Sequence, residues 1–170
     1  MSGSFYRRLA MGAALLAAGA VAWYRVPSVP GTRGGMGSAG PAAAVVQRVI
    51  DGDTVVLSGG ERVRYIGVDT PELHHPRKPV QWYAREAKEF NRQLVDGKSV
   101  RLELDVEKRD RYGRLLAYVY LKDGTFVNAE LLRQGFGQLL TIPPNVKHVG
   151  LFVQMQKEAR EAGRGLWARH

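Results

Sequence analysis

The sequence predicts a small α+β domain, built on a partly open β-barrel of five short strands with interspersed helices. Short runs of β-branched or alternating residues are separated by turns rich in Asp and Gly, which is typical of strands. Other segments carry apolar residues at helical spacing. The 170 residues are 45% hydrophobic and 24% charged, a composition that supports one globular core and excludes a disordered or collagen-like chain.

Five segments are expected to be strands, and the first three to pair as a meander. The turn Asp51-Gly52-Asp53 joins the first two runs, which is a hairpin signal. Gly residues turn the chain again before the third run, which breaks at Asp69-Thr70-Pro71. The predicted strands span residues 44–50, 54–57, 62–68, 99–106 and 115–121.

Three helices are expected in the same domain. The first ends at Asp96-Gly97, the short second one is capped by Asn128 and ends at Gly135, and the long amphipathic third one ends at Gly163. The predicted helices span residues 81–95, 128–134 and 146–162.

The first 26 residues are predicted to be a signal-anchor or a signal peptide that forms a short hydrophobic helix. Residues 9–24 carry no charge, follow Arg8 and end on Trp23-Tyr24 before Arg25. These 16 residues are fewer than the ~20 that span a bilayer comfortably, but an aromatic pair followed by Arg resembles the interfacial end of a membrane helix. A single-pass N-terminal membrane anchor is therefore expected.

Two alternatives for this segment remain open. Small residues at Ala18 and Ala20 fit a signal-peptidase site, which would give a secreted protein. The first 50 residues contain five Arg and no acid, as a mitochondrial or plastid presequence does. The Gly-, Pro- and Ser-rich residues 27–41 are predicted to be a flexible linker, and residues 42–170 to be the folded domain.

The charge favours an anionic partner. The chain has 25 Lys and Arg against 16 Asp and Glu, a net charge of +9, of which residues 51–170 carry 20 basic and 16 acidic residues, or +4. Nucleic acid or a phospholipid surface would suit this excess. The absence of Cys excludes disulfides, thiolate metal sites and a Cys nucleophile.

Four acids lie at turns and are candidates for chemistry. Asp51 and Asp53 lie between the first two strands, and Asp69 and Glu72 follow the third. Asp is common in turns, but in a meander these two turns would meet at one end of the barrel. Several hard oxygens suit Ca²⁺ or Mg²⁺. His74 and His75 adjoin the cluster, but adjacent loop residues point apart, so solvated histidines are the simpler interpretation.

Two arginines supply the opposite charge. Arg64 stands on the third predicted strand, and Arg114 opens the fifth. A planar guanidinium binds phosphate oxygens in a bidentate manner. Hydrolysis of a phosphate ester needs positive charge on the phosphoryl group and a carboxylate that takes a proton from water. The chain contains both.

Five motifs in order resemble staphylococcal nuclease (thermonuclease-like) domains, over about residues 44–167. They are Ile50-Asp51-Gly52-Asp53-Thr54, the stretch from Arg64 to Asp69-Thr70-Pro71-Glu72, Asp110-Arg111-Tyr112-Gly113-Arg114-Leu115-Leu116-Ala117-Tyr118, Leu132-Arg133-Gln134-Gly135 and Gly165-Leu166-Trp167. The resemblance implies an OB-fold barrel of five strands with three α-helices, and Ca²⁺-dependent cleavage of phosphodiester bonds in DNA and RNA.

The resemblance also implies roles for single residues. Asp53 and Asp69 match the calcium carboxylates, and Thr70 matches the residue that offers its carbonyl to the metal. Glu72 matches the general base, and Arg64 and Arg114 match the arginines that bind phosphate and stabilise the transition state. Tyr112 is expected near the substrate, and Arg77-Lys78 resembles a basic loop that contacts backbone phosphates.

The chain departs from the family at one place. Members that bind a nucleoside bisphosphate carry tyrosines on the segment before the last helix, and residues 137–145 here contain none. No residue is identified that would read base edges, so cleavage is expected to be largely independent of sequence and sugar, with single strands preferred.

The alternative to an enzyme is a non-catalytic OB-fold module that binds single-stranded nucleic acid or a protein. Basic stripes and aromatic platforms would mark such a module, whereas the predicted domain carries only +4 and a full set of carboxylates and arginines. An anchored scaffold has no support in the sequence, and no protein partner is predicted.

Overall fold

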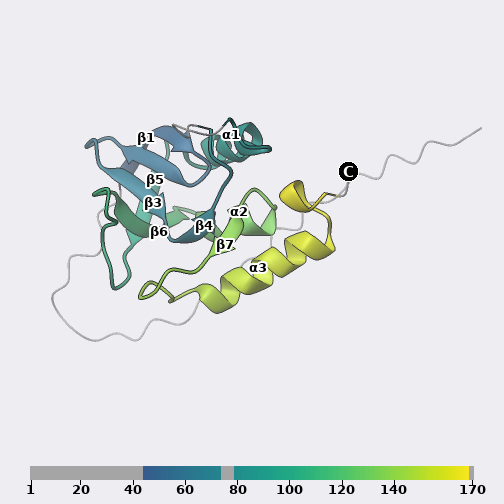
Figure 1. The fold of residues 1–170 in the computed structure, drawn as a ribbon. Coiled ribbons are helices and arrows are strands. Elements are labelled where there is room, and N and C mark those ends of the chain that lie inside the picture. The colour runs from purple at the N-terminus through teal and green to yellow at the C-terminus, as the bar shows by residue number, and fades with distance from the viewer. Residues whose placement is uncertain (1–43, 74–78, 169–170) are drawn as a thin grey trace, which may run out of the picture. The chain divides into compact units, whose positions relative to one another are not determined.

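The computed structural model describes residues 44–73 and 79–168, and its centre is a closed five-stranded barrel with the strand order β1-β2-β3-β6-β5 (Figure 1). The five-stranded barrel that the sequence predicts is confirmed, and it is closed rather than partly open. The strands are β1 (Ala44–Asp51), β2 (Thr54–Leu57), β3 (Arg62–Tyr65), β5 (Ser99–Glu103) and β6 (Leu115–Leu121).

The first three strands form the expected antiparallel meander, in which Thr54 is opposite Asp51 on one side and Arg64 on the other. β3 then pairs in parallel with β6, and β5 closes the barrel by pairing antiparallel with both β6 and β1. This register brings the turn between β1 and β2 next to the strand that carries Arg64.

The predicted strand at residues 62–68 is wrong as one element, because the chain breaks it into β3 and β4 (Gly67–Asp69). Gly67 adopts a φ of +79°, and a side chain there would collide with the Phe152 ring. The break redirects the chain, so that β4 pairs with β7 (Gln138–Leu140), a strand that the sequence analysis did not predict. The predicted strand at 99–106 is also too long, since β5 ends at Glu103.

Three α-helices accompany the barrel, as predicted, within the described ranges. α1 (Ala84–Val95) begins three residues later than expected because Tyr83 adopts a left-handed φ of +68°. α3 (Val149–Glu161) also begins three residues late, because the backbone of His148 is not helical. α2 (Val127–Arg133) begins one residue before the predicted helix, and the prediction that Asn128 caps it is wrong, because Asn128 lies inside α2 and its side chain bonds the barrel instead. A short 3-10 helix, η1 (Gly165–Trp167), follows α3.

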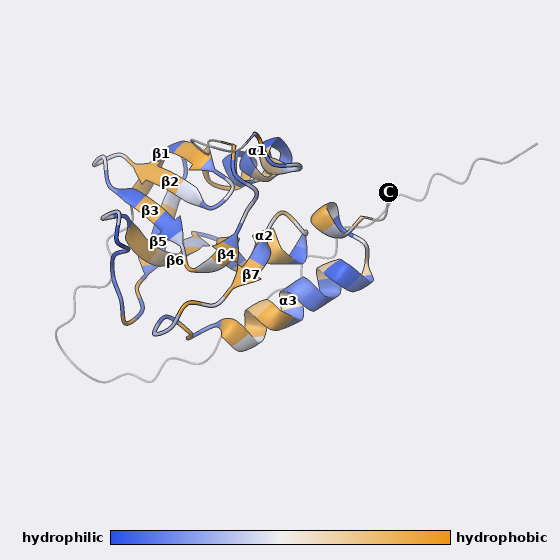
Figure 2. Cartoon of the chain, viewed as in Figure 1, coloured by the Kyte–Doolittle hydropathy of each residue, from blue (hydrophilic) through white to orange (hydrophobic). Residues whose placement is uncertain are grey.

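The core fills the barrel and continues under the helices. Figure 2 shows that α3 is apolar in its N-terminal half and polar toward its C-terminal end, and Phe152 from the apolar half is buried. Two buried amides tie helices to strands: Asn128 of α2 donates to the Ile66 carbonyl at 2.8 Å, and Asn91 of α1 donates to the Asp51 carbonyl at 3.2 Å. The largest fully buried side chains are Tyr65, Tyr118, Phe152, Leu131 and Leu132.

Several predictions fall on residues that the structure does not describe. They are the apolar helix within residues 1–26, the linker at 27–41, and the loop residues His74, His75, Arg77 and Lys78. Among residues 44–73 and 79–168, no helix combines the length and the apolar character that crossing a membrane requires.

Candidate active site

The two acidic turns meet, as the predicted meander requires. Asp53 is buried, and its Oδ2 accepts hydrogen bonds from the Thr70 backbone N–H at 2.8 Å and from the Thr70 hydroxyl at 2.9 Å. Gly52 lies so close to Thr70 that an added Cβ would stand 2.7 Å from its hydroxyl oxygen. The turn after β1 is therefore packed directly against the end of β4.

Arg64 lies between the two carboxylates of this cluster. Its Nη1 is 3.1 Å from Asp53 Oδ2, and its Nη2 is 2.9 Å from Asp69 Oδ1. The same guanidinium donates from Nη1 to the backbone carbonyls of Tyr65 and Val68. These contacts hold Arg64 in one orientation at the mouth of the acidic cluster.

The cluster carries more negative charge than Arg64 balances. Burial raises the pKa of the Asp69 carboxyl, the neighbouring Asp53 and Glu72 raise it further, and Arg64 opposes them. Asp53 and Asp69 both contact Arg64, and Glu72 adds a third negative charge near Asp69, so the site favours an additional cation. Within the described ranges, no three Asp, Glu or His side chains are close enough to hold a metal ion by themselves.

Glu72 is exposed, and its backbone is fastened to the start of the next helix. The Glu72 N–H donates to the Gln81 side-chain oxygen at 3.0 Å, and the Gln81 N–H donates back to the Glu72 carbonyl at 3.1 Å. Gln81 was not singled out from the sequence, because nothing local links it to a residue nine positions earlier. These two hydrogen bonds fix the backbone position from which the Glu72 side chain extends.

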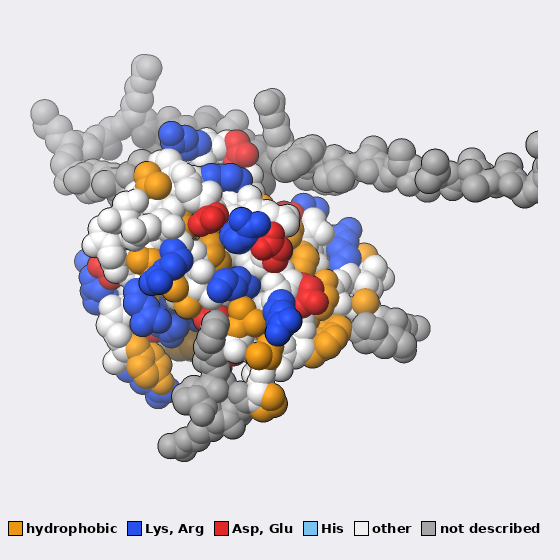
Figure 3. All heavy atoms as spheres, turned by 90° about the horizontal axis from the view of Figure 1, so that it is seen from above, with side chains coloured by type: hydrophobic (Ala, Val, Ile, Leu, Met, Phe, Trp, Pro, Cys, Tyr) orange, Lys and Arg blue, Asp and Glu red, His pale blue; other side chains and the backbone are white. Residues whose placement is uncertain are grey.

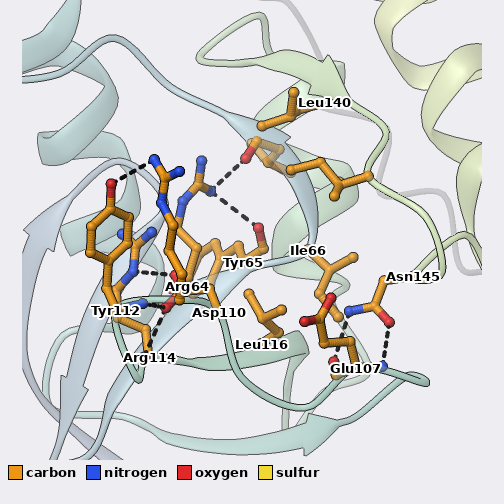
Figure 4. Close-up of a pocket in the computed structure, with 14 residues that line it drawn as sticks. Arg64, Tyr65, Ile66, Glu107, Asp110, Tyr112, Arg114, Leu116, Leu140 and Asn145 are labelled. Atoms are coloured by element: carbon orange, nitrogen blue, oxygen red, sulfur yellow. Dashed lines mark hydrogen bonds and ion pairs between the residues drawn. The ribbon is translucent and has the colours of Figure 1, made fainter.

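A pocket of about 480 Å³ lies beside the acidic cluster, with Arg64 and Arg114 both in its lining (Figure 4). Tyr112 stands at its rim with 68% of its surface exposed. The Arg114 guanidinium lies 5.5 Å from the centre of the Tyr112 ring, and Arg111 donates to the Tyr112 hydroxyl at 2.7 Å. The pocket thus combines two guanidinium groups with an aromatic rim.

The segment without tyrosines lines the opposite side of this pocket. Leu140 and Ile142 lie in the wall, and both keep substantial exposed surface. Asn145 fixes the end of the segment through a pair of 2.8 Å hydrogen bonds with the Glu107 backbone. The wall that faces Tyr112 is therefore aliphatic, and any stacking partner for a base would have to be Tyr112.

One face of the domain carries charges of both signs. Figure 3 shows Lys and Arg side chains spread over much of the face seen from above, with Asp and Glu side chains among them. This face is a mixed surface rather than a continuous basic stripe. Its pattern does not match the stripe expected of a pure nucleic-acid-binding module.

The structure brings most of the predicted site residues together. Direct contacts link Arg64 to Asp53 and Asp69, and Asp53 to Thr70. Glu72 is close enough to Asp69 to raise its pKa. Arg114 and Tyr112 line the same pocket as Arg64. Arg77 and Lys78 lie outside the described residues. Asp110 also lines the pocket; it stood in a motif quoted for the resemblance, four residues before Arg114, but it was given no role from the sequence.

The chain is similar in sequence to known proteins. The family model described as "Staphylococcal nuclease homologue" matches residues 62–169. The chain is 45% identical to a thermonuclease of Staphylococcus intermedius over 128 residues, which covers 74% of this chain and 76% of that protein. It is 37% identical to a thermonuclease of Staphylococcus hyicus over 148 residues, 85% of this chain and 87% of that protein. It is 40% identical to Endonuclease YncB of Bacillus subtilis (strain 168) over 129 residues, 73% of this chain and 61% of that protein.

Proposed function

Because the chain belongs to the family of staphylococcal nuclease homologues, we propose that it is a hydrolytic nuclease that cleaves phosphodiester bonds in DNA and RNA with the help of Ca²⁺. One observation carries the proposal: Arg64 contacts both carboxylates of the acidic cluster and also lines the pocket that holds Arg114. A phosphate in that pocket would meet both guanidinium groups next to the carboxylates.

The residues of the cluster fit Ca²⁺. Asp53 Oδ1 accepts only the Thr54 hydroxyl at 3.0 Å within the described residues, so it retains room for a further partner. Asp69 is half-exposed, and the carbonyl of Thr70 follows it in the chain. Two carboxylates and a carbonyl are hard oxygen ligands, and water and substrate oxygens would complete the six to eight that Ca²⁺ takes. When bound, the ion would neutralise charge on the phosphate and polarise it.

The chain's own residues supply the remaining steps. Glu72 accepts a proton from the water that attacks phosphorus. The bond from phosphorus to the leaving oxygen breaks, and that oxygen takes up a proton from solvent. Arg64 and Arg114 stabilise the extra negative charge on the pentacoordinate phosphate. None of these residues reads a base edge, which supports cleavage that is largely independent of sequence and sugar, and Tyr112 at the rim favours an unpaired strand whose bases are free to stack.

The proposal includes a membrane tether. Residues 9–24, without a charge between Arg8 and Arg25, would anchor the nuclease by a single N-terminal pass. A secreted form after cleavage, or import into a mitochondrion or plastid, is the alternative for the same segment.

The alternative function is a non-catalytic module that binds single-stranded nucleic acid or a protein. A cleavage assay separates the two: the 42–170 fragment is incubated with single- and double-stranded DNA and RNA, in Ca²⁺ and in chelator. Cleavage in Ca²⁺ that stops in chelator and resumes when Ca²⁺ is restored supports the enzyme. Binding without cleavage in Ca²⁺ supports the module.

A further inference from the structure

The carboxylate of Asp110 holds both the backbone of the turn before β6 and the side chain of Arg114. Oδ1 accepts the N–H groups of Tyr112 at 2.9 Å and Arg114 at 3.0 Å, and Oδ2 accepts Arg114 Nε at 2.7 Å. We propose that Asp110 is a positioning residue for the cleavage reaction, which orients the Arg114 guanidinium so that its two terminal amino groups face the substrate phosphate. This inference rests on the proposed nuclease function.

Asp110 occupies the Nε edge of the guanidinium and leaves the pair of Nη groups at its end for a bidentate contact with phosphate. An Arg side chain offers Nε on one side and two Nη groups at its end, and Asp110 takes Nε. Within residues 44–73 and 79–168, the Nη groups of Arg114 make no hydrogen bond or ion pair, and the side chain lines the pocket (Figure 4). Arg109 on the same turn differs, because its Nη groups are taken by Glu61 at 2.8 and 2.9 Å.

The turn that carries Asp110 is itself rigid. The Gly113 N–H donates to the Asp110 carbonyl at 2.9 Å, and the Asp110 N–H donates to the Arg114 carbonyl at 3.0 Å. Gly113 supplies the φ of +78° that this turn requires. The carboxylate therefore starts from a fixed backbone, and a guanidinium clamped to it loses little further freedom when substrate binds.

The Asp110 carboxylate also places a negative charge beside Arg114. Burial would raise the pKa of Asp110, but hydrogen bonds from Arg114 and from the turn backbone lower it below its usual value, so the carboxylate is ionised at neutral pH. An anion beside Arg114 weakens the attraction of the pocket for phosphate. Removal of the charge should therefore leave substrate binding unchanged or stronger while turnover falls, a combination that general damage to the fold would not produce.

The test variant is Asp110→Asn in the full chain. Asn keeps an oxygen for the turn N–H groups, where Asn is well tolerated, but it cannot offer a second acceptor to Arg114 Nε. We expect kcat to fall about 10- to 100-fold, the usual cost of a misplaced catalytic group, with KM unchanged or lower. The matched control is Asp123→Asn, since Asp123 also accepts a turn N–H, from Thr125 at 2.9 Å, but holds no arginine. It should cleave at the parent rate.

Two further measurements separate positioning from a structural role. In an Arg114→Ala background, Asp110→Asn should lower kcat no further, because the group it positions is already absent. In nuclear magnetic resonance spectra, the Arg114 Nε–H signal, assigned by its loss in Arg114→Ala, should shift and exchange faster with water in Asp110→Asn.

The inference is overturned if folded Asp110→Asn keeps the kcat of an active parent, if it lowers kcat equally with and without Arg114, or if the Nε–H signal is unchanged. A parent that does not cleave nucleic acid rejects the proposed nuclease. In that case the Nε–H signal still decides whether Asp110 clamps Arg114, so the two failures are distinguishable.

Discussion

The Asp53 carboxylate accepts two hydrogen bonds from Thr70, seventeen residues later in the chain: one from the backbone N–H and one from the hydroxyl. Asp53 is buried and also forms an ion pair with Arg64, so it is a structural residue as well as a proposed calcium ligand. Asp69 differs, since its side chain is 55% exposed and its pKa is raised by partial burial and by neighbouring acids.

The two aspartates should therefore respond differently to replacement. Asp53→Asn and Asp69→Asn should both weaken Ca²⁺ binding by about tenfold or more, as measured by titration calorimetry. In chelator, Asp53→Asn should also lower the free energy of unfolding by about 1–3 kcal/mol, because the buried Asp53 carboxylate accepts two hydrogen bonds from Thr70 and pairs with Arg64. Asp69→Asn should not, since a raised pKa means that the ionised carboxylate at pH 7 is less favourable in the folded than in the unfolded chain. Equal unfolding energies in urea would contradict this distinction.

Glu72→Gln should slow cleavage by about 10² to 10⁴, the usual contribution of a positioned general base, with little change in KM. The backbone bonds with Gln81 do not involve the Glu72 carboxylate, so the fold should persist. Circular dichroism and thermal melting check that it does. Glu86→Gln, an exposed change on α1, is the control and should cleave normally. A folded Glu72→Gln that cleaves at the parent rate would exclude Glu72 as the base.

Arg114→Lys should be nearly as damaging as Glu72→Gln, because Lys keeps the charge but loses the planar pair of donors. Arg64→Lys should lower turnover similarly and should also reduce the melting temperature, since the Arg64 side chain holds two backbone carbonyls and two carboxylates. Arg109→Lys, whose guanidinium pairs with Glu61 instead, is the control. Parent-like turnover in Arg114→Lys would indicate that Arg114 acts only through its charge.

Acid should weaken the link between α3 and the barrel through Glu103. Burial would raise the pKa of Glu103, but hydrogen bonds from Lys147 at 2.7 Å and His148 at 3.0 Å outweigh it and lower the pKa below 4.5. A lowered pKa stabilises the fold above the unfolded value of 4.5, and this contribution is lost as pH falls through the folded pKa.

Glu103→Gln should accordingly cost about 1 kcal/mol at pH 7 and less at pH 3, measured by urea unfolding at both values. Glu161→Gln on the exposed end of α3 provides the comparison, because its ion pair with Lys157 is long, at 3.7 Å, and solvent-exposed. A Glu103→Gln penalty that is the same at both pH values would show that the loss comes from packing rather than charge.

The proposed tether predicts that the full-length protein partitions with membranes and resists carbonate extraction. A fragment starting at residue 42 contains every described strand and helix, so it should be soluble and equally active. Recovery of an unprocessed full-length protein in the soluble fraction would reject the anchor. A shortened soluble form would favour signal cleavage.

Local patterns determined most of the barrel. Alternating apolar residues and turns such as Asp51-Gly52-Asp53 located all five barrel strands, because strand period and turn chemistry are properties of a few neighbouring residues. The acids of the proposed site stand at turns or strand ends that the sequence marks, and Arg64 and Arg114 stand on or beside predicted strands, but their proposed roles rest on the resemblance to the family.

Tertiary structure decided what depends on distant partners. The break at Gly67 follows from the Phe152 ring 85 residues later, and β7 exists only because β4 turns outward to pair with it. Gly135 and Gly165 match the family pattern in the sequence, but only the fold shows that their backbones touch and leave no room for a side chain on either.

The same division holds within the site. Composition and spacing place Arg114 beside a turn, but they do not say which edge of its guanidinium is engaged. The fold gives that answer, because the Asp110 carboxylate accepts Nε at 2.7 Å and Arg114 lies in the lining of the pocket. A residue's type sets what it can do chemically, and the contacts that its atoms make in the folded chain decide which of those atoms are available to do it.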